Sequence, residues 1–222
     1  MRPDMEFVSS NAKIPFRCQK CAECCRHVDG ALMLEPLDVY RLTKYLCEHG
    51  ESYDDTSEML HKYAHSATID RGYPIFQINT TGEDHACVFL KDGRCGVYEA
   101  RPQVCRMYPF GVAPGARGKD FNYYLCTERK HHFGIGSVKV KDWLNDNFSK
   151  EAREFYRIEY RMLPEFGRAV ESIGEEGVIR NMFQILYHLY FGYDLSEPFL
   201  SQYESRKDAM LKMLNDNAKE SD

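Results

Sequence analysis

The stretch Cys18-x-x-Cys21-x-x-Cys24-Cys25 decides how the N-terminal part of this sequence folds. Thiols three residues apart on a tight loop can converge on one metal centre. The adjacent residues Cys24 and Cys25 cannot easily turn toward the same ion. One of them is therefore expected to serve a second centre, to bridge two metals or to remain without a metal.

Four further cysteines follow after a long gap. Their spacing lacks the second close pair of a zinc ribbon, which disfavours that fold without excluding zinc. Eight thiolates could build two four-cysteine sites, one compact multinuclear site, or one four-cysteine cluster beside four other thiols. We predict an iron–sulfur centre, with zinc as the alternative, and the predicted metal ligands are Cys18, Cys21, Cys24, Cys25, Cys87, Cys95, Cys105 and Cys126. The ninth cysteine, Cys47, lies in an amphipathic helical pattern and is expected to pack as a small apolar residue.

Basic residues gather beside these cysteines, directly flanking them at Arg17, Lys20, Arg26, Arg94 and Arg106. Cations lower the pKa of nearby thiols and offset the repulsion among thiolates. Arg106 and Arg101 are therefore expected to contribute to cofactor binding indirectly, through hydrogen bonds to sulfur.

Histidines are weaker candidates for ligands. His27, two residues after Cys25, is the best placed of them for an auxiliary ligand. His131 and His132 could supply a ligand or a proton relay, but ordinary loop residues are expected there. His61 and His65 stand four apart in a predicted helix, where such pairs are mostly solvated.

Composition limits the function classes. The 222 residues carry a formal charge of −5 and no basic tract longer than Arg129-Lys130, so nucleic acid is not an expected partner. No stretch has the apolar length of a signal peptide or a membrane helix, which predicts a cytoplasmic location and no membrane association. In a reducing compartment, clustered cysteines are more often metal ligands or redox thiols than disulfides. The expected partner is a protein or redox partner of unknown identity.

Hydrophobic periodicity and turn residues predict an α+β fold. Residues 1–139 are expected to form a metal-stapled cysteine-cluster domain with short helices and a β-hairpin, and residues 140–222 a helical segment packed on it. Helices are predicted over 36–50, 54–66, 140–162, 165–173, 175–191 and 197–216, a strand over 73–78, a helical turn after Arg101-Pro102 and a loop over 111–118. A hairpin at Asp92-Gly93 is expected to carry Cys87 and Cys95. A two-residue turn would put them on opposite faces, whereas a three-residue loop with a bulge would bring them to one face, so a metal shared by the two predicts the bulge.

A longer pattern resembles a known family. It consists of the cysteine run from Cys18 to Cys25, of Cys126, and of the segment Cys87-Val-Phe-Leu-Lys-Asp-Gly-Arg-Cys95-Gly-Val-Tyr98-Glu-Ala-Arg101-Pro102-x-x-Cys105-Arg106-x-Tyr108-Pro109-Phe110. The pattern is similar to the YkgJ-type CxxCxxCC family of zinc- or iron-chelating proteins, over about residues 14–145. The resemblance implies metal chelation by the same eight cysteines. The family also contains flagellin lysine N-methylases, which are taken to use an iron–sulfur cluster and S-adenosylmethionine.

The expected function is metal binding with a redox or cluster-assisted catalytic role, as in an oxidoreductase. The alternatives are a structural zinc-binding or interaction protein without catalysis, and an S-adenosylmethionine-dependent protein lysine methyltransferase. S-Adenosylmethionine is not expected, because the chain is short for a flagellin methylase and has no glycine-rich fingerprint for a nucleotide-like cofactor. Whether the protein is an enzyme is left open by the sequence.

Overall fold

The computed structural model describes residues 5–69, 72–115 and 120–219. The chain divides into two compact units, each built from two separate stretches of sequence. Unit 1 comprises Met1–Asp29 and Thr80–Arg161, and unit 2 comprises Gly30–Asn79 and Met162–Asp222. Helix accounts for 50% and strand for 22% of the structure, which confirms the predicted α+β class. The units interleave along the sequence, and the division into the consecutive domains 1–139 and 140–222 stays a prediction.

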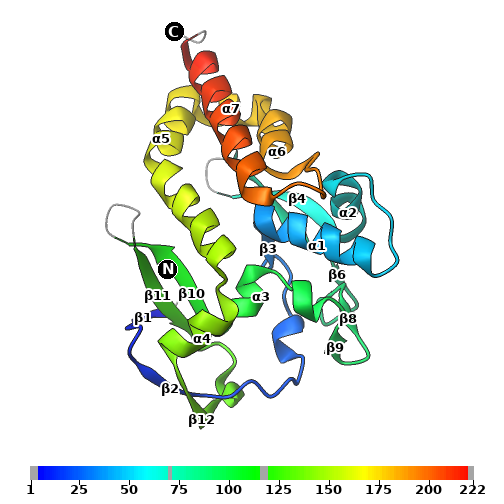
Figure 1. Ribbon diagram of the computed structural model, residues 1–222, viewed down its shortest axis with the longest axis vertical. Helices are drawn as coiled ribbons and strands as arrows, with labels where there is room; N and C mark the ends of the chain where they lie inside the picture. The colour runs from blue at the N-terminus through cyan, green and yellow to red at the C-terminus, as the bar shows by residue number, and fades with distance from the viewer. Residues whose placement is uncertain (1–4, 70–71, 116–119, 220–222) are drawn as a thin grey trace. The chain divides into compact units, whose positions relative to one another are not determined.

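Unit 1 is built on small antiparallel sheets (Figure 1). Strand β11 lies between β1 and β10, whereas β2 pairs with β12. Two short ladders, β6–β7 and β8–β9, carry Cys87 and Cys95. The strands of this unit are β1 (Met5–Val8), β2 (Lys13–Phe16), β6 (Thr80–Thr81), β7 (Ala86–Cys87), β8 (Leu90–Lys91), β9 (Arg94–Cys95), β10 (Phe110–Pro114), β11 (Phe121–Cys126) and β12 (Phe133–Lys139).

Short helical segments complete unit 1. They are η1 (Glu23–Cys25), η3 (Tyr98–Ala100), α3 (Gln103–Met107), η5 (Lys130–His132), α4 (Val140–Asn147) and the first turns of α5 (Lys150–Arg180). The buried ring of Phe16 packs edge-on against Trp143 at a centroid distance of 5.5 Å, and the Trp143 indole donates a hydrogen bond to the Met107 carbonyl at 3.0 Å. Since Phe16 ends β2 just before Cys18, this packing anchors the start of the cysteine loop.

Unit 2 combines the sheet β3–β5–β4 with helices. Its elements are β3 (Met33–Leu34), α1 (Pro36–Glu48), α2 (Thr56–Tyr63), β4 (Ala64–Thr68), β5 (Pro74–Ile78), the rest of α5, α6 (Met182–Tyr190) and α7 (Phe199–Lys219). Helix α1 begins as predicted: Pro36 occupies its first turn, and Glu35 and Asp38 form a capping box. Within this unit α6 contacts α1, α7 and β5.

Several predicted elements need correction. The helix predicted over 54–66 ends at Tyr63, because residues 64–68 pair with β5 instead. The helix predicted over 140–162 breaks at Phe148, and Ser149 then caps α5 by accepting a hydrogen bond from the Ala152 amide at 3.1 Å. Helix α5 runs without a break from its first turn through 165–173, and its kink at Gly174, where φ is 65°, agrees with the predicted boundary between the helices over 165–173 and 175–191. The helix predicted over 175–191 is divided, because α5 ends at Arg180 and α6 begins at Met182.

The loop predicted over 111–118 is wrong for its first residues. Residues 110–114 form β10 and pair with β11, and Gly111 lies directly opposite Tyr124. A Cβ atom at position 111 would clash with the Tyr124 ring. The glycine therefore permits a close cross-strand contact, where the prediction took it for a loop residue. Residues 116–118 lie outside the described part of the chain.

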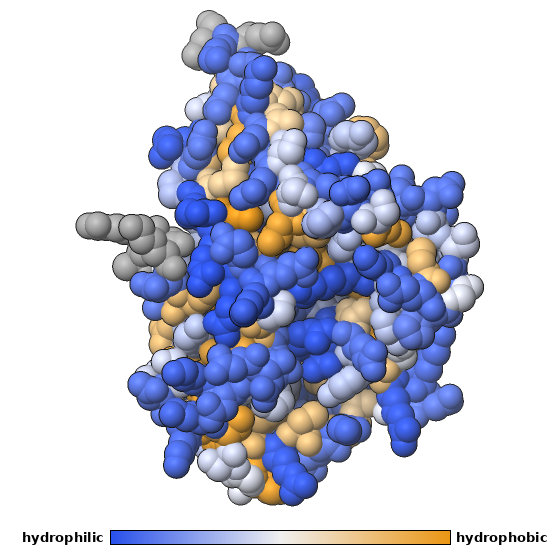
Figure 2. All heavy atoms as spheres, in the orientation of Figure 1, coloured by the Kyte–Doolittle hydropathy of each residue, from blue (hydrophilic) through white to orange (hydrophobic). Residues whose placement is uncertain are grey.

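The face drawn in Figure 2 is mostly hydrophilic, with apolar side chains in smaller groups between the charged and polar ones. Of the helices in the described ranges, none combines the length and apolar character that crossing a membrane requires.

Candidate metal centre

The loop that carries the first four cysteines is tightly wound. Lys20, Ala22 and His27 have φ values of 54°, 61° and 52°, a left-handed conformation that is uncommon for residues other than glycine. The Cys25 amide donates to the Ala22 carbonyl at 2.9 Å, which closes η1. The His27 amide then donates to the Asp84 carbonyl at 2.7 Å. These bonds hold Cys24 and Cys25 beside the segment that leads into Cys87.

Five thiols from four elements of unit 1 interact electrostatically, and we call them the thiol group: Cys24, Cys25, Cys87, Cys95 and Cys105. Cys24 and Cys25 share a side-chain hydrogen bond. Negative charge on Cys24 raises the pKa of both Cys87 and Cys95, and charges on Cys105 and Cys95 raise that of Cys25. The structure therefore brings together one half of the CxxCxxCC motif and three of the four later cysteines.

The members of the thiol group differ in how readily they ionise. The hydrogen bond from Cys25, with help from Arg129 and Arg101, lowers the pKa of Cys24 to about 7. The same hydrogen bond and burial raise the pKa of Cys25. Burial raises the pKa of Cys87 to about 11 and also raises that of Cys95. A bound cation would reverse these upward shifts, because a metal ligates the thiolate form.

The predicted bulge between Cys87 and Cys95 is wrong. Strands β8 and β9 join through a two-residue turn in which Asp92 and Gly93 have φ values of 50° and 69°, and Cys95 pairs with Leu90. Cys87 belongs to another ladder, in which it pairs with Thr80. Cys87 and Cys95 therefore do not lie on the two arms of one hairpin, and the alternation of side chains along a hairpin does not decide whether they face each other.

Two arginines supply positive charge to the thiol group. Arg101 stacks over the Tyr98 ring at 4.0 Å and donates to the Tyr98 carbonyl at 2.7 Å, and its charge lowers the pKa of Cys24 and Cys95. Arg129 donates to the Arg26 carbonyl at 2.9 Å and lowers the pKa of Cys24. The sequence prediction named Arg101 but missed Arg129, which does not directly flank a cysteine.

Arg106, the other arginine predicted to contact sulfur, donates a hydrogen bond to the Glu99 carbonyl. Its role beside the cofactor stays a prediction, as does that of Arg101. The same holds for the ligation of metal by Cys18, which is exposed, and by Cys126, which is half-buried at the end of β11. Cys126 nevertheless lies near the thiol group, because both Cys126 and Cys24 lie close to Tyr108. Burial is the main cause that raises the pKa of Tyr108, and charges on these two cysteines raise it further.

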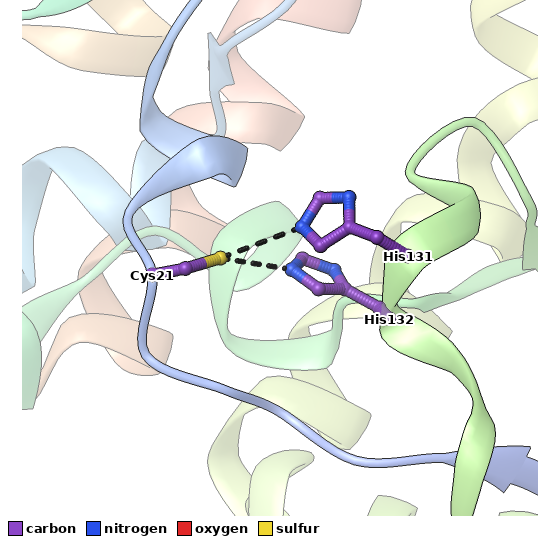
Figure 3. Close-up of side chains that lie close together, drawn as sticks. All are labelled: Cys21, His131 and His132. Carbon is purple, nitrogen blue, oxygen red and sulfur yellow. Dashed lines mark hydrogen bonds between the residues drawn. The ribbon is translucent and has the colours of Figure 1, made fainter.

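A second group of donors involves histidine, and Figure 3 shows it. The imidazoles of His131 and His132 both point toward Cys21, with Nε2 to Sγ distances of 3.6 Å and 3.1 Å. A zinc site typically needs at least three Cys, His, Asp or Glu side chains whose ligand atoms lie close together. Among the described residues, these three are the group whose ligand atoms all lie within 4.8 Å of one another. His132 is buried, whereas Cys21 and His131 are exposed. Burial, together with the charges of His131 and Arg129, lowers the pKa of His132, which favours the neutral form that binds metal.

Backbone contacts between distant segments create this second group. Strand β2 pairs with β12, so that the Arg17 amide donates to the His132 carbonyl at 3.3 Å, and the Gln19 side chain donates to the His131 carbonyl at 3.1 Å. The sequence prediction that His131 and His132 are ordinary loop residues missed this set. The signal that could have found it is a histidine pair five residues after Cys126.

The remaining candidates lie elsewhere. Cys47 is half-buried in α1 and belongs to unit 2, unlike the eight predicted ligands. His61 lies on α2 but His65 lies on β4, so their predicted helical spacing is wrong; the His65 Nδ1 atom is 2.9 Å from the Asn79 Oδ1 atom. The His27 side chain is exposed.

An α+β protein with gathered thiols and a thiol–imidazole set has the donors of a metal-chelating protein. A model of the CxxCxxCC family, described as "Putative zinc- or iron-chelating domain", matches residues 17–132. The match spans more than half of the chain and includes all eight predicted cysteine ligands together with His131 and His132. The chain belongs to this family. Searches of curated proteins and of solved structures gave no match.

Proposed function

We propose that the thiol group holds an iron–sulfur cluster and that the protein has a redox or cluster-assisted catalytic role with a protein partner in the cytoplasm. The observation that carries the proposal is the gathering of five interacting thiols from η1, β7, β9 and α3. Four thiolates are enough to hold a [2Fe–2S] or [4Fe–4S] cluster.

The spacing of the donors supports a cluster over a single ion. Around one tetrahedral zinc, bond lengths of about 2.3 Å would place thiolate sulfurs about 3.8 Å apart. Within the described residues, the three-donor set inside 4.8 Å is Cys21, His131 and His132, and the thiol group does not form such a set. The four cysteine ligands of a [4Fe–4S] cluster bind different iron atoms and stand farther apart, so the looser group suits a [4Fe–4S] cluster better than a single ion.

The surroundings of the thiol group also suit electron transfer. Arg101 and Arg129 bring positive charge to Cys24, which stabilises the more negative reduced state of a cluster. Cys24 is exposed, and Cys25, Cys95 and Cys105 are half-buried. A cluster on these ligands would lie near the protein surface, within reach of a partner that donates or accepts one electron.

Anaerobic purification with iron and acid-labile sulfide analysis tests the proposal. We expect iron and sulfide in equal amounts and a visible absorption that dithionite bleaches by reducing the cluster by one electron. Cys95→Ser should lose most of the iron and sulfide, whereas Cys47→Ser, a half-buried cysteine of unit 2, should keep them. Colourless protein without sulfide would refute the proposal.

A structural zinc protein without catalysis is the second candidate, and the thiol–imidazole set favours it. Mixed cysteine and histidine ligands are typical of zinc. In that case the purified protein should contain zinc without sulfide, and reductants should leave its spectrum unchanged.

A further inference from the structure

We infer that the CxxCxxCC motif is divided between two centres, with Cys21 joining His131 and His132 in a separate mononuclear site for a divalent cation of the zinc class. Cys24 and Cys25 of the same motif belong to the thiol group. The inference does not depend on which metal the thiol group holds.

One of the two sulfur–nitrogen distances matches a zinc site, and the other is about 0.5 Å shorter. With Zn–S and Zn–N bonds of about 2.3 and 2.0–2.1 Å, a tetrahedral ion places a ligand sulfur about 3.6 Å from a ligand nitrogen. The Cys21 Sγ atom lies 3.6 Å from His131 Nε2 and 3.1 Å from His132 Nε2. Small side-chain rotations would therefore be enough to admit an ion among the three atoms shown in Figure 3.

Tyr108 orients one of the ligands. Its hydroxyl lies 3.2 Å from His132 Nδ1, on the opposite edge of the ring from Cys21. When Nδ1–H donates to this hydroxyl, Nε2 keeps its lone pair for the ion, which is the usual arrangement of a histidine ligand and its outer partner. Phe16 packs edge-on against the His132 ring at a centroid distance of 6.2 Å and limits its rotation.

The site has three protein ligands and an accessible side. His132 is buried at 2% exposure, whereas Cys21 and His131 are exposed. Structural zinc sites normally have four protein ligands, and zinc sites with three keep the fourth position for water or a substrate atom. We therefore assign the fourth position to an exchangeable water molecule on the exposed side of Cys21 and His131.

X-ray absorption at the zinc edge tests the inference on full-length protein that is purified anaerobically, incubated with zinc and desalted. When the thiol group holds iron, we expect one zinc per chain with one sulfur and two imidazole nitrogens, the remaining ligand being oxygen; when the thiol group holds zinc, we expect a second zinc of this kind beside it. His131→Ala, at an exposed position, should lose this zinc while leaving any metal of the thiol group in place. His61→Ala, an exposed histidine on α2, is the matched control and should keep it.

The outcomes separate this inference from the iron–sulfur proposal. Zinc with one sulfur and two nitrogens in protein without sulfide would support the mononuclear site and refute the cluster. Iron and sulfide with no zinc bound, or zinc surrounded by sulfur alone, would overturn the mononuclear site. Loss of iron and sulfide in His131→Ala would also overturn it, because the histidine would then serve the same centre as the thiols.

Discussion

The Tyr108 hydroxyl lies 3.2 Å from Nδ1 of His132, while Nε2 of the same ring faces Cys21. This contact links the segment after α3 to η5, and when Nδ1–H donates to the hydroxyl, Nε2 of His132 is left for a metal. Tyr108 also lies near the thiol group: burial is the main cause that raises its pKa, and charges on Cys126 and Cys24 raise it further. One tyrosine thus lies beside both groups of donors.

Tyr108→Phe should weaken zinc binding at the Cys21 site by about 10- to 100-fold, the usual cost of removing the outer partner of a histidine ligand. Cobalt titration followed by absorption spectroscopy checks this. The bands of the cobalt-loaded variant should keep their positions, because the three ligands remain. Tyr123→Phe on β11 is the control. Unchanged affinity in Tyr108→Phe would show that the hydroxyl does not orient His132.

Arg129→Gln should lower the reduction potential of the proposed cluster, because the variant removes a positive charge that now acts on Cys24. A shift of about 30–60 mV corresponds to a factor of about three to ten in the equilibrium. Redox titration monitored by visible absorption measures it. Lys141→Gln, at an exposed position on α4, should leave the potential unchanged. An upward shift in Arg129→Gln would contradict the assigned role.

Metal removal should unfold unit 1 selectively, because metal ligation replaces part of its hydrophobic core. Hydrogen exchange after anaerobic chelation is expected to show protection falling by about 100-fold or more in 5–29 and 80–139, with α1 and α7 retained. This experiment also tests the domain prediction. If residues 1–139 formed one domain, α1 and α2 would lose protection together with the cysteine segments.

Glu51 should make unit 2 sensitive to acid. Partial burial raises the pKa of Glu51, but hydrogen bonds from Lys62, Tyr53 and Tyr63 outweigh this and bring it down to about 2. Because the folded pKa lies below the usual value of about 4.5, the stabilisation is complete above pH 4.5 and is lost as the pH falls toward 2.

Glu51→Gln should therefore cost about 1 kcal/mol in the free energy of unfolding at pH 7, the scale of a surface charge network. The difference from the parent protein should shrink between pH 4.5 and 2. Urea unfolding at several pH values measures it, and a difference that is constant across this range would show that the Glu51 charge is not responsible.

Local signals in the sequence were enough for several elements. Pro36 and Gly50 bracket α1, the β-rich run at 74–78 forms β5, and the turn after Pro102 forms α3 with Cys105. Gly111 was wrongly predicted to lie in a loop. The sequence around it does not distinguish a loop glycine from a strand glycine that lies opposite a tyrosine of the neighbouring strand.

The gathering of the candidate donors was predictable where they lie in one short motif and less so where it depends on long-range pairing. Cys24 and Cys25 were recognised from their spacing. The approach of His131 and His132 to Cys21 depends on the pairing of β2 with β12, more than 100 positions apart. No local pattern around Cys21 encodes that pairing.

Anomalous diffraction from crystals of anaerobically purified protein, recorded at the iron and zinc edges, tests the central claim most directly. We predict an iron peak among Cys24, Cys25, Cys87, Cys95 and Cys105, and a separate zinc peak beside Cys21, His131 and His132. Crystals of metal-loaded protein with no anomalous peak at either group of donors would contradict the account.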